Sequence, residues 1–514
     1  MKYLLEISKI VTKKKVRKIE IFDDHSLKHK NSKFNEFYES LMTGKLRNDR
    51  DAATLLYDCS PTDDKYRQLK SRFKKRLLNT LFFLDVNLPS TSSYDRAYYS
   101  CNKDWTLVKI LLSNDAEHTA ASLARQLLTT SRKFKFADVI VNCSRILRRY
   151  ASLQGDEKKY TLYDECIKEY QEILTAEIRS EEYYQRTLIM YRNISSIDEA
   201  SKERLNTYCD DLVMLSEAFD SPVINYNMYM VWAYRFEMLS DYSSALQVCA
   251  TAENYIENNP TYYQDDKLAL FQLKKMNAYL HLCHYSTGTE KNNYYKEGKL
   301  NAEKCLKSFP EGSDIWFTFM EYYLLMSIHT DNFINALAIY KQASANSKFK
   351  KLTGVEKQKW LMYDMYLNYI VESQRTNNPI LGAQQRSSFR VSRILKQEAS
   401  YPKKQRILNI YLMIVQALFF IEKHSYAEAT ERIEALRNAA NHQLRNNNHF
   451  RVIQFIRLLQ QLARVDFQYD ELKNVEKTFN RLVNKPFVYY GSLEELEIIP
   501  YDKLWLMLLD RLKK

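Results

Sequence analysis

The amino-acid composition predicts an all-α protein. The 514 residues include only 8 Gly and 9 Pro, together about 3% against an average of roughly 12%. β-rich folds need glycine at turns and bulges, and nucleotide-binding α/β folds need it beside phosphate. Apolar residues recur at helical spacing along most of the chain, with short polar turns between them. We therefore expect an α-solenoid, in which antiparallel helical hairpins stack side by side.

The clearest hairpin pattern runs through residues 229–260. Each half places apolar or small residues on one helix face, at i, i+3, i+4 and i+7 spacing in the first half. The first half carries Tyr229, Trp232, Ala233 and Phe236, and the second carries Ala245, Cys249, Ala252 and Ile256. The polar residues 240–242 separate the halves, and Pro260 blocks further helix because it lacks an N–H. The small residues are expected to let two helix backbones approach closely.

This hairpin resembles a degenerate tetratricopeptide repeat, in which small and aromatic residues recur over about 34 residues. Ala233, Ala245 and Ala252 stand at small positions of that pattern, while Cys249 replaces an aromatic residue. Two further copies carry Ala336, Tyr340 and Ala343, and Ala417, Phe420 and Ala429. The anchors at 245, 336 and 429 lie 91 and 93 residues apart, which suggests two helical pairs per interval. Another kind of stacked helical array would select the same residue types.

The sequence suggests a basic helical unit over residues 1–88, a Pro/Ser/Thr-rich linker over 89–95 and the repeat array over 96–514. Within the array, separate helices are expected near 160–174, 182–191 and 265–285, among others. The last residues, 501–514, are amphipathic and are expected to cap the open end of the array or to dock on another chain.

The net charge of +13 is concentrated at the N-terminus. The first 80 residues carry 20 Lys+Arg and 11 Asp+Glu, a net charge of +9. The basic residues of interest are Lys13, Lys14, Lys15, Arg17 and Lys18, and Arg67, Lys70, Arg72 and Lys74 on a helix expected over 65–84. A short helix and turn before this basic helix resemble a helix-turn-helix, although the usual turn glycine falls on Tyr57. A nucleic acid, an acidic protein or merely solvent are the alternatives for the basic face.

No sequence motif for catalysis is found. Phosphate loops, nucleophile elbows, HExxH and kinase motifs are missing from the sequence. His281 and His284 lie close together with Cys283 between them, and without a second ligand pair they predict an ordinary helix surface rather than zinc. The eight cysteines are scattered singly, as expected for buried thiols in a reducing compartment. We expect no metal or cofactor.

Together these features predict a cytoplasmic, non-enzymatic scaffold or adaptor. Curved helical arrays bind an extended peptide or a helix of another protein on the concave face. The alternative is a nucleic-acid-linked regulator, in which the basic helix contacts nucleic acid and the array senses a partner. A solenoid enzyme with an unfamiliar site is the third hypothesis. No apolar stretch is long enough to suggest a membrane span.

Overall fold

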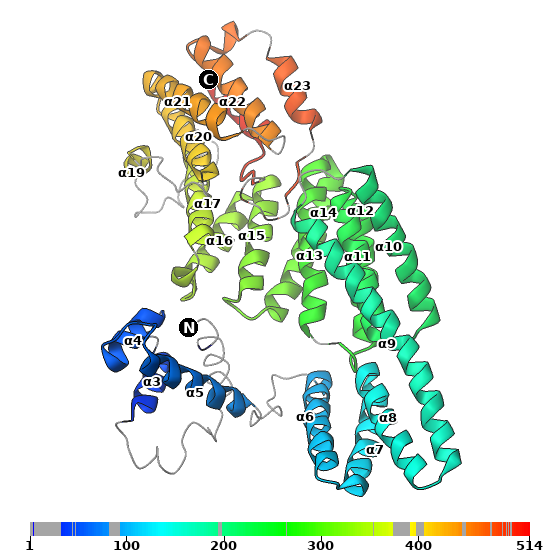
Figure 1. Cartoon of the computed structure of the whole chain (residues 1–514). Helices are drawn as coiled ribbons and strands as arrows, with labels where there is room; N and C mark the ends of the chain where they lie inside the picture. Colours follow the sequence, from blue (N-terminus) through cyan, green and yellow to red (C-terminus); the bar gives the residue numbers. More distant parts are fainter. Residues whose placement is uncertain are drawn as a thin grey trace. The chain divides into compact units, whose positions relative to one another are not determined.

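The computed structural model contains helices and connecting segments in the part of the chain that it describes (Figure 1). It describes residues 32–81, 93–193, 198–373, 391–396, 406–444, 449–472, 475–489 and 496–513, together with residues 4, 491 and 493 and apart from residues 44, 47, 264, 353 and 486. The all-α prediction is confirmed for these residues. In the same ranges, each helix is too short or too polar to cross a lipid bilayer.

The chain divides into two compact units, residues 1–175 and 176–514. The division falls inside helix α9 (Glu157–Arg192), where the sequence suggests two separate helices. The stretch between the two expected helices contains no glycine or proline, so nothing in it interrupts the helical hydrogen bonds. The expected linker over 89–95 lies outside the described residues except for its last three, which begin α6 (Ser93–Ser113).

The first unit contains a bundle of α3 (Lys33–Met42), α4 (Asp49–Tyr57) and α5 (Asp64–Leu81). Phe37 and Phe73 fill its core with ring centroids 4.6 Å apart. Ala52 and Ala53 are fully buried, which lets α4 lie close to its neighbours. α6 then packs on α7 (Glu117–Phe134), and α7 packs on α8 (Ala137–Leu153), with a core of its own.

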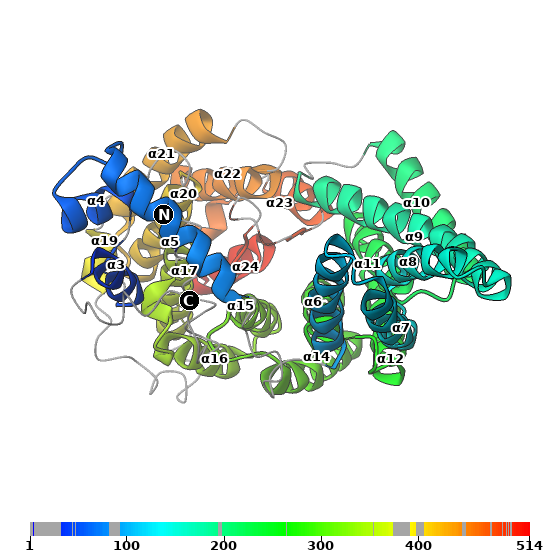
Figure 2. The ribbon, with the colours of Figure 1, turned by 60° about the horizontal axis from the view of Figure 1, so that its bottom comes forward.

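In the second unit, successive helices pack against one another from α10 to α17, and the same order continues from α20 to α23 (Figures 1 and 2). The helices are α10 (Glu199–Ala218), α11 (Pro222–Met238), α12 (Tyr242–Asn258), α13 (Asp265–Tyr285), α14 (Gly288–Ser308), α15 (Asp314–His329), α16 (Phe333–Ala345), α17 (Gly354–Ser373), α19 (Val391–Leu395), α20 (Ile407–Glu422), α21 (Tyr426–Gln443), α22 (Phe450–Arg464), α23 (Glu476–Asn484) and α24 (Tyr501–Leu512). The expected helix over 265–285 is confirmed with those bounds.

The three hairpins that carry the repeat pattern share one turn geometry. Three residues separate α11 from α12, α15 from α16 and α20 from α21, and the middle residue is left-handed in each, with φ of 59° at Ser240, 61° at Asp331 and 57° at His424. The following amide donates to the carbonyl five residues earlier, at 2.9, 2.8 and 2.9 Å. This is the Schellman closure of a helix end. The left-handed residues lie 91 and 93 residues apart, the same intervals as the alanine anchors.

The described prolines lie at helix ends or between helices, as the sequence predicts. Pro222 opens α11 after the Ser221 cap, and Pro500 caps α24. Pro260 and Pro310 lie between helices. In α24, Leu504, Trp505 and Leu508 are buried, and the helix packs on α22 and α23. Figure 2 shows α24 between α15 and α22, so it covers apolar surface of its own array.

Candidate functional site

The most distinctive feature of the second unit is the segment between α23 and α24, which we call the strap and whose described residues are 485, 487–489, 491, 493 and 496–500. Apart from one residue with 3-10 geometry at 493, these residues are not helical. Five apolar side chains of the strap are nevertheless at most 3% exposed, namely Phe487, Tyr489, Leu496, Ile498 and Ile499. A segment of this kind must satisfy its backbone polar groups by other means than a helix.

The first part of the strap is bonded to α13 through backbone atoms. The Tyr489 N–H donates to Nε2 of His281 at 3.0 Å. His281 Nδ1 lies 2.8 Å from the carbonyl oxygen of Asn277, one turn earlier in α13. That carbonyl can only accept, so Nδ1 carries the proton and Nε2 is the acceptor. The Tyr285 hydroxyl donates to the Phe487 carbonyl.

Three histidines surround the ring of Phe487. Its centroid lies 5.4 Å from that of His281, 4.8 Å from that of His284 and 5.2 Å from that of His329 on α15. Burial lowers the pKa of His281 to about 4. Burial, followed by neighbouring positive charge, lowers the pKa of His284 and His329 well below the ordinary value. All three imidazoles are therefore neutral at pH 7.

The Tyr489 hydroxyl joins a buried carboxylate on α15. Tyr489 donates to Glu321 Oε1, and Tyr363 on α17 donates to the same oxygen at 2.9 Å. Lys359 Nζ lies 2.6 Å from Glu321 Oε2. Burial, and then the charge of Glu321, raises the pKa of Tyr363 and Tyr489 well above the ordinary value, so both remain donors. The strap thus supplies one of the three hydrogen-bond partners of the buried Glu321 carboxylate.

The last part of the strap is fixed by one arginine of α22. Arg451 contacts both carboxylate oxygens of Glu497, at 2.5 and 3.1 Å, and Asp502 at 2.9 Å. It also donates to the carbonyls of Leu482 and Lys485, at 2.8 and 2.6 Å. Burial raises the pKa of Glu497, and Arg451 opposes that shift. Arg451 therefore ties the end of α23, the strap and the start of α24 together.

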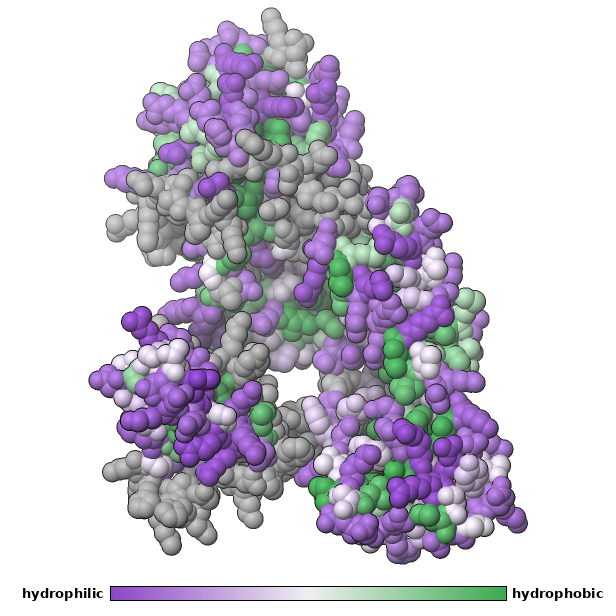
Figure 3. Space-filling model, in the orientation of Figure 1, coloured by the Kyte–Doolittle hydropathy of each residue, from purple (hydrophilic) through white to green (hydrophobic). Residues whose placement is uncertain are grey.

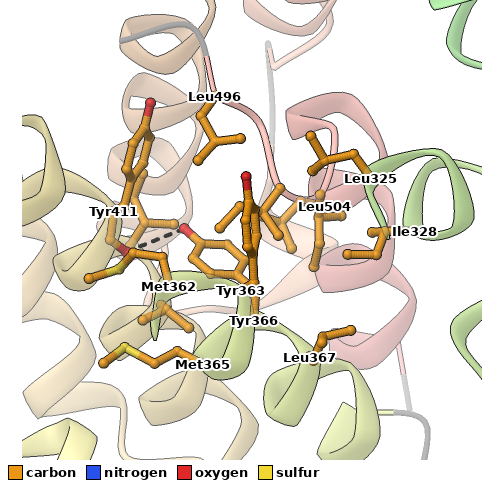
Figure 4. Close-up of a cluster of buried hydrophobic side chains, with 14 of the residues drawn as sticks. Leu325, Ile328, Met362, Tyr363, Met365, Tyr366, Leu367, Tyr411, Leu496 and Leu504 are labelled. Carbon is orange, nitrogen blue, oxygen red and sulfur yellow. Dashed lines mark hydrogen bonds between the residues drawn. The ribbon is translucent and has the colours of Figure 1, made fainter. Parts of the chain in front are cut away.

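Apolar packing accompanies these polar contacts. Leu496 of the strap and Leu504 of α24 face side chains of α15 and α17 (Figure 4). Their neighbours in that cluster include Leu325, Ile328, Met362, Met365 and Leu367. Tyr366 donates to the Tyr411 carbonyl at 3.3 Å, and the Tyr411 hydroxyl donates to the Leu493 carbonyl at 2.7 Å. The strap is therefore bound by side chains from α13, α15, α17, α20 and α22.

The histidine pair singled out in the sequence lies under this strap. The expectation of an ordinary helix surface is wrong for His281, which is fully buried. The physical reason is the long-range contact with Tyr489, 208 residues away. Both ring nitrogens of His281 have hydrogen-bond partners. Cys283 is also buried, which raises the pKa of its thiol to about 12. Within the described ranges, groups of three or more His, Cys, Asp or Glu with metal-binding geometry are absent.

The repeat-core residues lie where neighbouring helices meet. The alanines are at most 2% exposed: Ala233, Ala245, Ala252, Ala336, Ala343, Ala417 and Ala429. Tyr340 is buried, whereas Tyr229, Trp232, Phe236 and Phe420 are partly buried. The structure does not bring these positions to the strap as a group. They pack the hairpins of α11, α12, α16, α20 and α21, whereas the strap contacts come mainly from α13, α15, α17 and α22.

The basic residues predicted at the N-terminus divide into two groups. Lys13, Lys14, Lys15, Arg17 and Lys18 lie outside the described residues. On α5, Arg67, Arg72 and Lys74 are exposed, whereas Lys70 lies 2.6 Å from Asp49 on α4. The left-handed residue of the α4–α5 turn is Asp58 rather than Tyr57, with φ of 49°. The surface of the α3–α5 bundle is largely hydrophilic in the view of Figure 3.

Sequence reasoning missed the strap. The signal that marks it is short: apolar residues alternate or cluster between Pro486 and Pro500, around Phe487, Tyr489 and Ile498. Prolines at both ends of an apolar stretch without helical spacing favour an extended, buried segment.

No known protein family, curated protein or solved structure matches the chain.

Proposed function

We propose that the protein is a non-catalytic adaptor whose helical array binds an extended segment of a partner protein. The observation that supports this proposal is the strap, a non-helical stretch bound by side chains of α13, α15, α17, α20 and α22. Its backbone is bonded by His281, Tyr285 and Tyr411. Its aromatic side chains, Phe487 and Tyr489, are buried against α13 and α15. Backbone bonds for affinity and pockets for alternate side chains are the usual means of recognising an extended peptide.

The proposed partner segment has the chemistry of the strap, with two aromatic residues separated by one residue. Phe487 and Tyr489 provide this pattern, and the Tyr489 hydroxyl reaches the buried Glu321. A tetratricopeptide-like array with a concave binding face is the architecture that this proposal favours, because such arrays bind peptides there. The proposed role lies in the cytoplasm, in keeping with the scattered cysteines.

A labelled synthetic peptide with the sequence of residues 485–500 tests the proposal by fluorescence anisotropy. The full-length protein carrying Phe487→Ala has a weakened strap, so we expect it to bind the peptide more tightly than the wild-type protein does. A control peptide with alanine in place of both Phe487 and Tyr489 should not bind. Equal binding of both peptides, or no binding of either to the variant, would contradict the proposal.

A second candidate function is nucleic-acid binding through α5, which one observation favours. The exposed side of α5 carries Lys65, Arg67, Arg72 and Lys75 in addition to Lys74. A helix that follows a short helix and a tight turn, with a basic outer face, has the elements of a helix-turn-helix reader of duplex DNA. Binding of this kind weakens steeply with salt.

Replacement of Lys65, Arg67, Arg72 and Lys75 by glutamate tests this candidate without removing the Lys70–Asp49 pair. A matched control changes four exposed lysines of α14 by the same total charge: Lys296, Lys299, Lys304 and Lys307. If α5 binds DNA, only the first variant loses affinity for a labelled duplex. Its remaining affinity should also depend less steeply on salt concentration than that of the wild-type protein. An equal loss in both variants indicates net charge alone, and the candidate is then wrong.

A further inference from the structure

The strap contacts three histidines, and each takes part in its attachment. His281 accepts the Tyr489 N–H at 3.0 Å. His329 Nε2 lies 3.0 Å from the Glu497 carbonyl oxygen, so this nitrogen carries the proton. His284 lies between them against the Phe487 ring, and the ring centroids of His284 and His329 are 5.5 Å apart. The imidazoles therefore contact the strap at Phe487 and Tyr489 and, through His329, at Glu497 as well.

Protonation of His281 is incompatible with the docked strap. The Nδ1 proton is engaged by the Asn277 carbonyl, so an added proton must go to Nε2. Nε2 would then be a donor facing the Tyr489 N–H, and two donors at 3.0 Å repel each other. Tyr242 stacks on the face of this imidazole, with ring centroids 3.9 Å apart, which leaves the ring little room to turn away.

Protonation of His329 or His284 is also unfavourable in the docked state. His329 Nδ1 is buried and has no hydrogen-bond partner among the described residues, so a proton added there would remain unpaired. If His284 and His329 were both charged, two cations would lie with their ring centroids 5.5 Å apart beside the buried Phe487 ring. Release of the strap removes each of these conflicts, because it gives the imidazoles access to water.

We propose that the strap is a pH-sensitive latch: mild acid protonates the three histidines, releases Phe487–Tyr489 from α13 and α15, and exposes the side chains that these residues cover. This inference goes beyond peptide binding and does not depend on the identity of a partner. The latch is local, because Arg451 still holds Glu497 and the end of α23 at the other part of the strap.

Other ionisable groups lie on the elements that pack around the histidines and the strap. These groups are Tyr242 on α12, Tyr285 on α13, Lys291 on α14, Glu321 and Asp331 near α15, Lys359 and Tyr363 on α17, Arg451 on α22, Tyr489 and Glu497 in the strap, and Asp502 and Lys503 on α24. Lys503 and Arg451 disfavour further positive charge. Glu497 acts in the opposite sense, because its raised pKa favours the folded state at acidic pH.

The direction of the pH effect follows from the histidine pKa values. An imidazole whose pKa is lowered in the docked state supports docking fully above its ordinary pKa of about 6.5. That support is lost as the pH falls toward 4, the docked value for His281. At pH 5.5, His281 alone shifts the equilibrium toward release by about tenfold. His284 and His329 add to this shift with the same sign.

Hydrogen–deuterium exchange of the full-length protein tests the latch. Protection of the strap peptide, corrected for the intrinsic effect of pH on exchange, is compared at pH 7.5 and pH 5.5. Helix α20 is the internal reference, because it is buried on nearly all sides. We expect strap protection to fall by tenfold or more while α20 keeps its protection. Unchanged strap protection overturns the proposal, as does a loss of protection in α20 to the same extent.

His281→Gln identifies the responsible group. The glutamine amide oxygen can accept the Tyr489 N–H but does not titrate, so the acid response should decrease by about tenfold. His442→Gln is the matched control, because His442 is exposed on α21. If His281→Gln releases the strap at pH 5.5 as the wild type does, the latch is not controlled by this histidine and the proposal fails. The experiment uses the protein alone, so its result is independent of peptide binding.

Discussion

The α11–α12 hairpin and the strap are held in place in different ways. The hairpin is closed by neighbours in sequence: the Asp241 amide bonds to Phe236, and fully buried Ala233 and Ala252 let the two helices approach. The strap is held by residues far away, with His281 and Glu321 lying 208 and 168 positions from Tyr489. Sequence periodicity reports the first kind of contact and is silent about the second.

The polar groups of the two regions differ accordingly. The hairpin helices meet mainly through small and apolar side chains, with Glu237 and Glu253 paired to Lys274 and Lys275 of the next helix, α13. In the strap, charged and hydroxyl groups fix the backbone directly. Such pairs stabilise little by themselves, yet the loss of one partner leaves a buried charge. Loss of one partner of a buried pair should therefore destabilise either region, whereas changes in side-chain volume should act mainly on the hairpin.

The largest expected effect is that of Arg451→Met on the strap. Glu497 would remain buried without its partner, so the free energy of unfolding should fall by about 3–5 kcal/mol. Guanidinium denaturation followed by circular dichroism measures this change. The double variant Arg451→Met, Glu497→Leu should recover much of the loss, because it removes both charges. A loss below about 1 kcal/mol in the single variant would show that this pair does not fix the strap.

A volume change in the hairpin should have a smaller effect. Ala252 is fully buried against α11, so Ala252→Leu should overpack the contact and lower the free energy of unfolding by about 1–3 kcal/mol. Ala250→Leu on the same helix is the control, because Ala250 is exposed and should change stability by less than about 0.5 kcal/mol. Equal effects in the same denaturation assay would argue against close packing at Ala252.

The smallest effect is expected at the turn, and it has the opposite sign. Ser240 is left-handed with φ of 59°, a conformation in which a side chain is strained and glycine is not. Ser240→Gly should raise the free energy of unfolding by about 0.5–1 kcal/mol. Thr251→Gly, at an exposed position inside α12, should lower it by a similar amount. Destabilisation by Ser240→Gly would contradict this turn geometry.

These differences explain how far the sequence could predict the fold. Gly and Pro scarcity and helical spacing were sufficient for the all-α class and for helix α13, because both depend on local preferences. The hairpin turns were harder to place, since Ser240, Asp331 and His424 occupy the left-handed position where glycine is usual. These three residues are separated by 91 and 93 positions, the same intervals that separate the alanine anchors at 245, 336 and 429.

The candidate site was largely beyond sequence reasoning. The His281–His284 pair drew attention because of its spacing, but its role depends on Tyr489 and Phe487, which a one-dimensional pattern cannot pair with it. Glu321 gave no signal either, since one carboxylate in an apolar helix does not identify its partners. Whether the chain is an adaptor, and whether α5 contacts nucleic acid, stay predictions.

The buried thiol of Cys283 makes the molecule its own reporter. It lies on α13 between the two histidines, and burial raises its pKa to about 12. A thiol in that state reacts with alkylating reagents only when the surrounding chain opens, because the thiolate is the nucleophile. The rate of alkylation of Cys283 by iodoacetamide, followed by mass spectrometry, therefore measures how often this part of α13 opens.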